Sequence, residues 1–436
     1  MRLAWFSPLP PVRSGVATVN ANLLPRLDEG LAIDRFVAAL ASRDHANVFD
    51  AHDFVWKQRR APYDLVVYQL GNASCHDYMW AYLARYPGLV VLHDPRLHHA
   101  RARQLLQRGR ADDYRREFRY DHPDAVGDFV EYAVEGLGGP IYYAWSMLRI
   151  VMRTARAVAV HNPRVASDLH EEFPDARVET IRLGTPAPAA DLAARARIRA
   201  ALGVGDDALL FAAFGKITAE KRIGPIVRAF SALAADRDDV HLLLAGDASE
   251  YAALAAHLSS SSTAARVHVT GYVPDAEVDD HLSAADACLC LRWPTALESS
   301  ASWLQCLSAG RPTVLSDLAH LADVPTIDPR SRRASRTSID PVAIAIDLLD
   351  EEGALLAAMR ALAGDRRFRE TLGRAGRAYW SANHTIDAMA DDYRRVIALA
   401  AAQPAPIVND LPAHFTDDHT SKARALAAQF GISLDF

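Results

Sequence analysis

The sequence contains little cysteine, no long apolar run and no excess of positive charge, and each absence excludes a class of protein. Its four cysteines, Cys75, Cys288, Cys290 and Cys306, include no Cys-x-x-Cys pair. We therefore expect four reduced thiols in or near the core, in a reducing compartment. No stretch reaches the roughly 18 apolar residues of a membrane-spanning helix. The apolar run at the N-terminus is too short for a signal peptide.

The charge balance argues against a nucleic-acid-binding protein. The formal net charge is -6, whereas proteins of that class usually carry a strongly basic domain. We expect a cytoplasmic protein without a nucleic-acid partner, and peripheral contact with the inner face of the membrane stays open. The 436 residues are enough for two or three domains with large apolar cores.

In the first half of the chain, short apolar runs alternate with helical patterns, which is typical of a parallel α/β fold. The runs are rich in aliphatic residues throughout, as in strands that are covered on both faces. The expected strands are Leu3–Ser7, Phe36–Leu40, Leu65–Leu70, Leu89–His93, Ala157–His161 and Val178–Leu183, and the expected helices include Val16–Leu27 and Asp124–Ala155.

Proline at positions 186 and 188 interrupts this pattern and indicates a linker between domains. The pattern then restarts, which predicts two successive Rossmann-like domains, with a single larger sheet as the alternative. From Pro341 to Ala402 we expect almost only helix. The pattern of residues 403–436 does not indicate a function. The expected strands of this half are Leu209–Phe214, His241–Ala245, Val267–Tyr272, Ala287–Leu291 and Pro312–Leu315.

Two candidate sites follow strands of the first half. Gly15 lies in the loop after the first strand and precedes a helix, where backbone N–H groups could bind a phosphate. An ordinary glycine turn is the alternative. His93 ends a later strand and is followed by Asp94, so an imidazole suited to proton transfer lies beside a carboxylate. A metal site with His98 and His99 is disfavoured by the spacing, and a structural histidine stays open.

Two further candidate sites follow strands of the second half. Lys216 and Lys221 lie in a loop that begins with glycine, where two compact cations can neutralise a diphosphate; a solvated basic turn is the alternative. The stretch Arg292–Pro312 carries Glu298 before the small residues Ser299 and Ser300, which begin a helix whose N–H groups favour an anion. A capped helix with an acidic first turn is the alternative.

These four sites, in this order, resemble those of the GT-B glycosyltransferases, specifically the retaining family 4. The resemblance extends to about residue 400 and is most specific in Gly246–Asp247, Val269–Pro274, Ala284–Ala287 and the Glu298 loop. It implies an α/β GT-B fold, in which two Rossmann-like domains face each other across a cleft and a C-terminal helix crosses back. The corresponding domains are residues 1–186 on the acceptor side, 187–378 on the donor side, 379–402 as crossover helix, and 403–436 as tail.

The resemblance also implies roles for individual residues. Gly15 would lie near the donor diphosphate, which Lys216 and Lys221 would bind, although arginine is commoner than lysine at position 216. His93 would donate or accept a hydrogen bond with the transferred sugar, and Asp94 would orient it. Glu298 would grip a sugar hydroxyl.

The sequence departs from the family at the second of two glutamates that are separated by seven residues. Glu298 matches the first, but Gln305 stands at the second, which normally binds the donor ribose. Glutamine can accept and donate hydrogen bonds but carries no charge, so donor affinity and nucleotide preference are put in doubt. The preceding Arg292-Trp-Pro-Thr resembles a bacterial subgroup in which the second glutamate is also relaxed. Backbone near Tyr272 and Val273 would lie beside the nucleobase.

We therefore expect transfer of a hexosyl group from a nucleoside diphosphate sugar, UDP- or GDP-linked, to an acceptor hydroxyl with retention of configuration. Lys216, Lys221, Ser299 and Ser300 would stabilise the leaving diphosphate. No aspartate pair with metal-binding spacing accompanies them, so neither a metal nor another cofactor is expected. The alternatives are a GT-B-like epimerase or phosphorylase and a non-catalytic sugar-nucleotide-binding protein.

The acceptor is not fixed by the sequence. A saccharide, a lipid-linked sugar or another hydroxyl compound would fit. Residues 96–119 form a probable helix that contains eight arginines and three acidic residues, which suits an anionic acceptor or a phospholipid surface. A solvated helix face is the alternative. The aromatic side chains of Tyr142, Tyr143 and Trp145 are expected in the core rather than stacked on sugars.

Overall fold

The computed structural model describes residues 1–40, 47–139, 141–189, 191, 193–259, 263–336, 339–417 and 420–433. The chain divides into two compact units. Unit 1 comprises Met1–Asn20, Asp28–Thr180 and Arg394–Phe436, and unit 2 comprises Ala21–Leu27 and Ile181–Tyr393. The chain passes from unit 1 to unit 2 between Thr180 and Ile181, six residues before the boundary that the prolines predict.

Unit 1 contains a parallel sheet of seven strands in the order β3-β2-β1-β4-β5-β6-β7. The chain begins in the middle of the sheet, builds one half outward and then returns to build the other half, so the order reverses between β1 and β4. In sheets of this type, ligands bind beyond the carboxyl ends of the strands at the reversal. The strands are β1 (Arg2–Phe6), β2 (Ala32–Val37), β3 (Val48–Asp50), β4 (Leu65–Leu70), β5 (Leu89–Leu92), β6 (Ala157–Val160) and β7 (Val178–Thr180).

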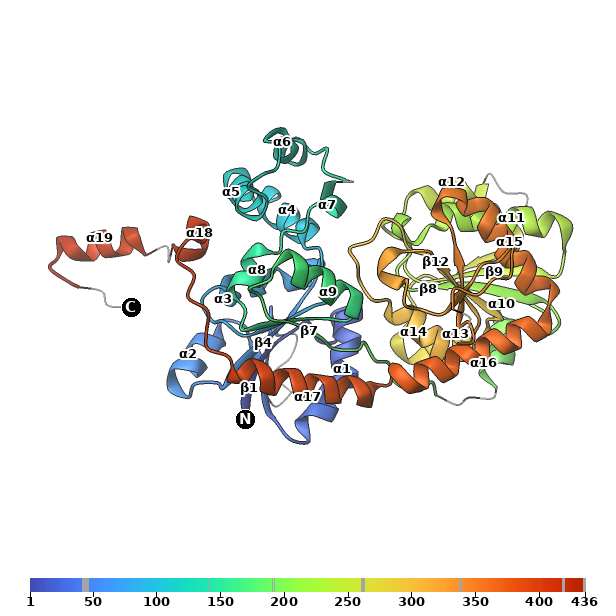
Figure 1. The fold of residues 1–436 in the computed structure, drawn as a ribbon, viewed down its shortest axis with the longest axis horizontal. Coiled ribbons are helices and arrows are strands. Elements are labelled where there is room, and N and C mark those ends of the chain that lie inside the picture. Colours follow the sequence, from blue (N-terminus) through green and yellow to red (C-terminus); the bar gives the residue numbers. More distant parts are fainter. Residues whose placement is uncertain are drawn as a thin grey trace. The chain divides into compact units, whose positions relative to one another are not determined.

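Unit 2 repeats this plan with a second parallel sheet of seven strands, in the order β10-β9-β8-β11-β12-β14-β13. Its order reverses between β8 and β11, which pair in parallel. Both units are therefore Rossmann-like (Figure 1). The strands are β8 (Leu209–Phe214), β9 (Val240–Ala245), β10 (Val267–Val269), β11 (Ala287–Cys290), β12 (Thr313–Ser316), β13 (Thr326–Ile327) and β14 (Ala343–Ile346).

Helices cover the sheet of unit 1, and one group forms a separate layer between β5 and β6. That layer has a core of its own, in which Leu105, Tyr114, Phe118 and Val130 are buried. The helices of the first 180 residues are α1 (Gly15–Asp28), α2 (Asp53–Arg60), α3 (Trp80–Leu83), α4 (His98–Leu106), α5 (Ala111–Asp121), α6 (Asp128–Val134), α7 (Ile141–Ala144), α8 (Arg149–Thr154) and α9 (Pro163–Glu172), with a 3-10 helix η1 (Ser74–Met79).

The remaining helices cover the sheet of unit 2 or continue from it. Helix α17 begins in unit 2 and ends in unit 1, since the division falls after Tyr393. These helices are α10 (Ala194–Leu202), α11 (Ile223–Asp236), α12 (Ala253–Ser259), α13 (Val278–Ala284), α14 (Ala301–Ser308), α15 (Glu351–Gly364), α16 (Arg366–Asn383), α17 (Ile386–Ala402), α18 (Ala413–Thr416) and α19 (Ser421–Gln429), with short 3-10 helices η2 (Ala219–Lys221), η3 (Ala264–Arg266), η4 (Asp275–Glu277), η5 (Ala319–Leu321) and η6 (Leu348–Asp350).

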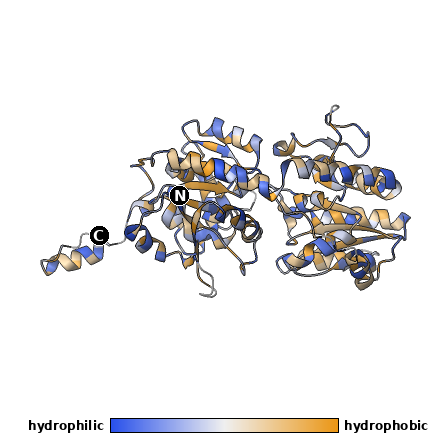
Figure 2. Ribbon diagram, turned by 90° about the horizontal axis from the view of Figure 1, so that it is seen from below, coloured by the Kyte–Doolittle hydropathy of each residue, from blue (hydrophilic) through white to orange (hydrophobic). Residues whose placement is uncertain are grey.

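The central strands are apolar along their whole length because both faces of each sheet are covered. In β8, Phe211 and Ala213 pack with α11 and α15 on one face, while Leu210 and Ala212 pack with α10 and α13 on the other. Successive side chains of a strand point to opposite faces, so a continuous apolar run is required here. Figure 2 shows the hydrophobic strands enclosed by helices with hydrophilic outer faces.

The α/β class and the GT-B architecture predicted from the sequence are confirmed, but three helix predictions are wrong in detail. Residues 124–155 form three short helices, α6, α7 and α8, because the glycines at 136–139 interrupt the segment, and Gly136 has a φ of +85°. Residues 96–119 form α4 and α5, separated at Gly109 with a φ of +68°. The start of 341–402 is the strand β14, which pairs with β12.

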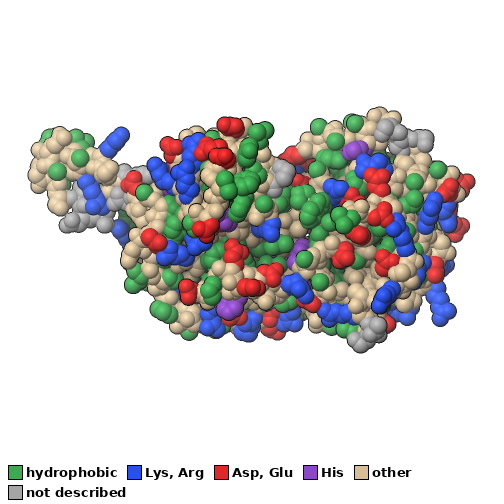
Figure 3. All heavy atoms as spheres, turned by 45° about the horizontal axis from the view of Figure 1, so that its top comes forward, with side chains coloured by type: hydrophobic (Ala, Val, Ile, Leu, Met, Phe, Trp, Pro, Cys, Tyr) green, Lys and Arg blue, Asp and Glu red, His purple; other side chains and the backbone are tan. Residues whose placement is uncertain are grey.

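The described thiols are free, and Cys288 and Cys306 are buried, in line with the expected reduced core cysteines. Among the described residues, no helix is long and apolar enough to cross a bilayer. Acidic and basic side chains are interspersed on the face shown in Figure 3, which fits the small net charge. In the arginine-rich segment 96–119, basic side chains are also paired with acidic ones. Arg103 pairs with Asp77, and Arg110 pairs with Asp113.

Candidate active site

In unit 2, the loops after β8 and β11 lie next to each other, because these two strands are neighbours at the point where the strand order reverses. The loop after β8 begins at Gly215, whose φ is +84°, and Gly246 packs against it. A Cβ atom on Gly246 would lie 2.2 Å from the carbonyl oxygen of Gly215. Glycine at both positions is therefore needed to bring the two turns together.

Lys221 folds back under this loop. Its Nζ donates a hydrogen bond to the carbonyl oxygen of Phe214, the last residue of β8. Burial, together with the positive charge of Arg292, lowers the pKa of Lys221 to about 7. A lysine with this pKa is only half charged at neutral pH and gains its full charge when an anion approaches.

Lys216 lies in the same loop but is exposed. Its Nζ lies 2.6 Å from a carboxylate oxygen of Glu250, and about half of each side chain or more is accessible to solvent. An exposed pair of this kind contributes little to stability and opens easily. Lys216 is therefore available to a ligand, whereas the side chain of Lys221 is held in place by its hydrogen bond to Phe214.

The loop after β11 holds Glu298 in a fixed position. Its Oε1 lies 2.8 Å from Nε of Arg292, while its Oε2 accepts hydrogen bonds from the Thr295 hydroxyl at 2.8 Å and from the Ala296 N–H at 2.9 Å. Leu297 adopts a φ of +65°, a conformation that side chains rarely take outside functional loops. The carboxylate is thus preorganised next to the cation Arg292.

Helix α14 begins directly after this glutamate. The hydroxyl of Ser300 caps it by accepting from the N–H of Trp303 at 3.2 Å, and Ser299 precedes the cap. The first turn directs its N–H groups toward the loop that carries Glu298, a geometry that favours anions. Gln305 lies one turn further and is half-buried; among the described residues, its side-chain amide has no hydrogen bond.

Tyr272 and Val273 follow β10 at the same edge of the sheet. Tyr272 is exposed, with 44% of its surface accessible, and Val273 packs on the apolar cluster beneath α10 and α13. The turn is made possible by Gly271, whose φ is +73°. The structure therefore brings Lys216, Lys221, Glu298, Ser299 and Ser300 to one edge of the sheet of unit 2, and Tyr272 and Val273 lie in the loop after β10, two strands away from β8.

In unit 1, His93 follows β5 and is flanked by residues from both neighbouring strands. Its Nε2 lies 2.7 Å from Oε1 of Gln69 on β4, and its Nδ1 lies 3.2 Å from Nε2 of His161 after β6. Burial lowers the pKa of His93 well below its ordinary value, and His161 lowers it further. His93 is thus a neutral imidazole, and a sugar hydroxyl would have to replace one of these two contacts.

Asp94 contacts the turn that follows β4. Its Oδ2 accepts the N–H of Asn72 at 2.6 Å. A Cβ atom on Gly71 would lie 3.0 Å from that oxygen and 3.2 Å from Nε2 of His76. The two ring nitrogens of His93 contact Gln69 and His161, and the expected orientation of His93 by Asp94 stays a prediction.

Gly15 is the first residue of α1, after the loop that follows β1. The Ser14 hydroxyl caps the helix by accepting from the N–H of Ala17 at 3.1 Å. A Cβ atom on Gly15 would meet nothing within 4 Å, so internal packing does not require glycine. The helix start is accessible, as the expected phosphate contact needs.

Four functional candidates were missed by the sequence reasoning. Arg292 and Thr295 lie in the stretch Arg292–Pro312, a few residues before Glu298. Their side chains can donate hydrogen bonds to a carboxylate, and this proximity was the signal in the sequence. Gln69 and His161 gave a weaker signal. Each is a polar residue at the carboxyl end of an apolar strand, but only the pairing of β4, β5 and β6 brings them level with His93.

Within the described part of the chain, no group of three or more His, Cys, Asp or Glu side chains is arranged to hold a metal ion. The predicted independence from metals is not tested by this and stays a prediction.

A family model matches part of the second unit. Residues 208–342 match the family described as glycosyl transferases group 1. No curated protein sequence matches the chain.

Solved structures with the same fold are glycosyltransferases of low sequence identity. Sucrose-phosphate synthase from Thermosynechococcus elongatus superposes with a TM-score of 0.64 at 15% identity, over 91% of this chain and 99% of that one. HepE from Anabaena, in complex with UDP and glucose, gives 0.63 at 12% identity over the same shares. WaaG, a glycosyltransferase involved in lipopolysaccharide biosynthesis, gives 0.62 at 13% over the same shares. These likenesses confirm the resemblance to the GT-B glycosyltransferases at the level of the fold.

Proposed function

Because residues 208–342 match the glycosyl transferases group 1 family and the whole chain has the GT-B fold, we propose that this protein transfers a hexosyl group from a nucleoside diphosphate sugar to an acceptor hydroxyl. The proposal includes retention of the anomeric configuration, as in the family that the sequence resembles. The donor is assigned to unit 2 and the acceptor to unit 1.

One observation carries the proposal: a half-buried lysine and a fixed carboxylate lie at the carboxyl edge of two strands where the order reverses. Lys221 is placed under a glycine turn, and Glu298 is held by Arg292. Breaking the glycosidic bond of the donor leaves negative charge on the diphosphate. A preorganised cation in a shielded site stabilises such charge far more than a cation in water does.

The remaining residues of unit 2 have complementary roles in this proposal. Lys216 leaves Glu250 to join Lys221 on the diphosphate, and Ser299 and Ser300 present their N–H groups and hydroxyls to it. Glu298 accepts a hydrogen bond from a sugar hydroxyl, since its Oε1 has a lone pair left beside Arg292. Gln305 takes the ribose, and the backbone at Tyr272 and Val273 takes the base.

No divalent ion is required in this scheme, because lysines, Arg292 and helix N–H groups supply the positive potential. UDP- and GDP-sugars are the expected donors. HepE, which shares the fold, has been solved with UDP-glucose. In unit 1, His93 contacts the transferred sugar as a neutral hydrogen-bonding group, and Gly15 contacts the diphosphate through the start of α1.

The first test is thermal stabilisation by UDP, GDP, ADP, TDP and CMP, each with and without magnesium. We expect one diphosphate to raise the melting temperature whether or not magnesium is present, and Lys221→Ala to abolish the shift. Lys57→Ala serves as the matched control, because Lys57 is also partly shielded but pairs with Asp34 in unit 1. A shift that survives in Lys221→Ala would show that the diphosphate binds elsewhere.

Catalysis is tested separately with the donor sugar of the nucleotide so identified. Released nucleoside diphosphate is measured with the wild type and with Glu298→Gln, which keeps the size of the side chain but removes its charge. Binding without any turnover of the donor, in the presence of saccharide and lipid-linked acceptors, would favour the non-catalytic alternative.

A further inference from the structure

Unit 2 contains a second pocket, at the opposite edge of its sheet from Lys221. It has a volume of about 450 Å³ and is lined by residues at the amino ends of strands, including Leu209, the first residue of β8, and Pro312 before β12. The six residues of β8 separate the two edges by roughly 20 Å at 3.3 Å per residue. The pocket is therefore distinct from the proposed donor site.

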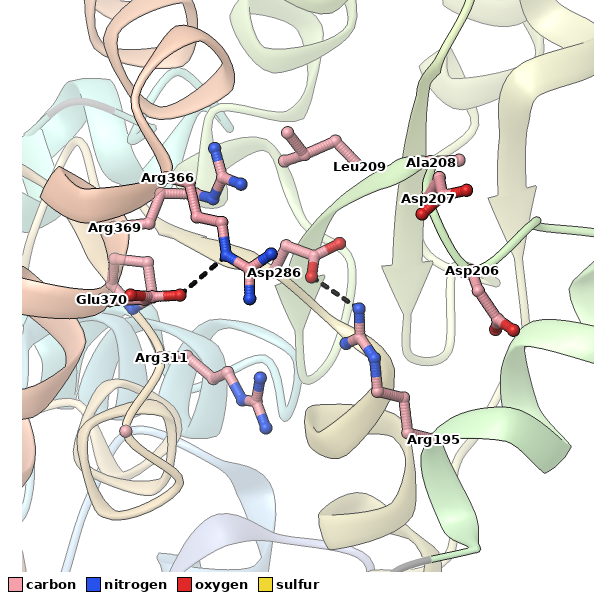
Figure 4. A pocket seen from close by; sticks show the side chains of 12 residues that line it. Arg195, Asp206, Asp207, Ala208, Leu209, Asp286, Arg311, Arg366, Arg369 and Glu370 are labelled. Carbon is pink, nitrogen blue, oxygen red and sulfur yellow. Dashed lines mark hydrogen bonds and ion pairs between the residues drawn. The ribbon is translucent and has the colours of Figure 1, made fainter.

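Arginine dominates one wall of this pocket. Figure 4 shows the guanidinium groups of Arg366, Arg311 and Arg195 directed into one space, with Asp206 and Asp207 across from them. Arg369 lines the same wall from α16. The volume lies within the range of small-molecule sites.

Two of the four carboxylates that line the pocket are already engaged. Asp286 accepts from Arg195 at 2.7 Å and from Arg199 at 3.2 Å, so one carboxylate is shared by two guanidinium groups. Glu370 pairs with Arg366 on the exposed first turns of α16. Among the described residues, the two remaining arginines of the pocket, Arg311 and Arg369, form no ion pair with a carboxylate.

Arg311 and Arg369 make hydrogen bonds only to backbone carbonyls among the described residues. Arg311 donates to Ala285 at 3.0 Å, and its Nε is buried without a hydrogen-bond partner in that part of the chain. Arg369 donates to Leu362, at the end of α15. Burial lowers the pKa of both guanidinium groups. A partly buried cation that is not in an ion pair is unfavourable, and a bound anion would reduce this cost.

We propose that this pocket binds the phosphate group of a small phosphorylated polyol. Arg311, Arg366 and Arg369 hold the phosphate, since guanidinium groups match its oxygens with paired hydrogen bonds. A phosphate alone fills only part of the volume. Asp206 and Asp207 on the facing wall accept hydrogen bonds from the hydroxyls of the ligand.

The proposal does not depend on the proposed transferase activity, and calorimetric titration tests it directly. The probes are inorganic phosphate and ribose 5-phosphate, in a chloride buffer without sulfate. We expect both to bind the wild type, the ester more tightly. Arg311→Gln and Arg366→Ala should each weaken binding about tenfold or more, since each removes a charge-assisted hydrogen bond.

Two controls separate this pocket from other anion sites. Arg367→Ala removes an exposed arginine adjacent to Arg366 that does not line the pocket, and Lys221→Ala disables the proposed diphosphate site. Both should bind the probes as the wild type does. Loss of binding in Lys221→Ala, unchanged binding in Arg366→Ala, or no binding by the wild type would each overturn the proposal. Arg366 is largely exposed, so its variant decides the test if Arg311→Gln does not fold.

Discussion

Lysine is rare in this chain, and its placement is therefore informative. Two of the four lysines, Lys216 and Lys221, lie within one loop, whereas nearly all other basic side chains are arginine. Arginine keeps its charge in almost any environment, while a buried lysine shifts its pKa readily. A lysine at position 221 can therefore lose its proton while the site is empty and regain it when an anion binds.

The pKa of Lys221, about 7, predicts how ligand affinity depends on pH. Above pH 7 the empty site holds mostly neutral lysine, and a diphosphate raises the pKa, so binding requires uptake of a proton. We expect the affinity for the diphosphate to fall by up to about tenfold per pH unit between pH 7 and 9. Titrations at pH 7, 8 and 9 measure this, and the slope should vanish in Lys221→Ala. A wild-type affinity that is constant over this interval would contradict the prediction.

Arg292 positions Glu298 and is predicted to matter for the rate more than for stability. Without the contact between Arg292 Nε and Glu298 Oε1, the carboxylate loses its fixed orientation. Misplacement of a catalytic group by about 1 Å can cost roughly a hundredfold in rate, so we expect Arg292→Ala to reduce turnover about 10–100-fold. Arg228→Ala breaks an exposed pair with Glu352 on α15 and should leave turnover unchanged. Equal losses in both variants would mean that Arg292 has no special role.

Part of the candidate site can be predicted from the sequence, because each of its loops is one continuous stretch directly after a strand. Lys221 and Glu298 each follow an apolar strand, and the carboxyl ends of parallel strands share one edge. The residues that contact His93 could not be predicted in this way. Gln69 and His161 lie 24 and 68 residues from it along the chain and meet it only through strand pairing.

At the level of elements, the site depends on a close contact between the turns after β8 and β9. Gly246→Ala would place a Cβ atom 2.2 Å from the Gly215 carbonyl oxygen, and the backbone would have to move. We expect a loss of about 1–3 kcal/mol in the free energy of unfolding, measured by urea denaturation. Gly205→Ala, whose Cβ would meet nothing within 4 Å, should change it by less than about 0.5 kcal/mol. Comparable values for the two variants would contradict the tight contact.

The strands best predicted from the sequence are those whose neighbours cover both faces. The predictions for β4 and β8 match the structure at both ends, because a short, mainly apolar run is typical of a strand that is buried on both faces. The sequence pattern predicts helix at β14, since Ala343–Ile346 is short and borders a long helical segment. Its pairing with β12 overrides the local helix preference of alanine. The short strands β3 and β13 were missed for the same lack of local signal.

At the level of the whole molecule, the first part of the C-terminal segment, through α18, packs on unit 1. His414 lies 2.6 Å from a carboxylate oxygen of Glu117, which also pairs with the buried Arg101. Asp410 pairs with Arg153 at 2.6 Å, and Phe415 packs on Trp80. No pattern in the sequence predicts these contacts, because their partners lie far away along the chain.

Removal of residues 403–436 should therefore destabilise unit 1 selectively. The deletion exposes the Arg101–Glu117 pair and the Trp80 ring to solvent. We expect faster amide hydrogen exchange in α4 and α5 and unchanged exchange in the strands of unit 2. His414→Ala, a milder change at the same place, should act in the same direction. Uniform acceleration in both units would show that they unfold together.

The division of unit 1 between the two ends of the chain has a consequence for its biosynthesis. Unit 2 is fully synthesised once Tyr393 has been added, but unit 1 still lacks Arg394–Phe436 at that time. At ~5–20 residues per second, this segment takes roughly 2–9 s to translate. During that interval the ribosome carries all residues of unit 2 but not all residues of unit 1, so the unit whose synthesis starts first is the last to be completely synthesised.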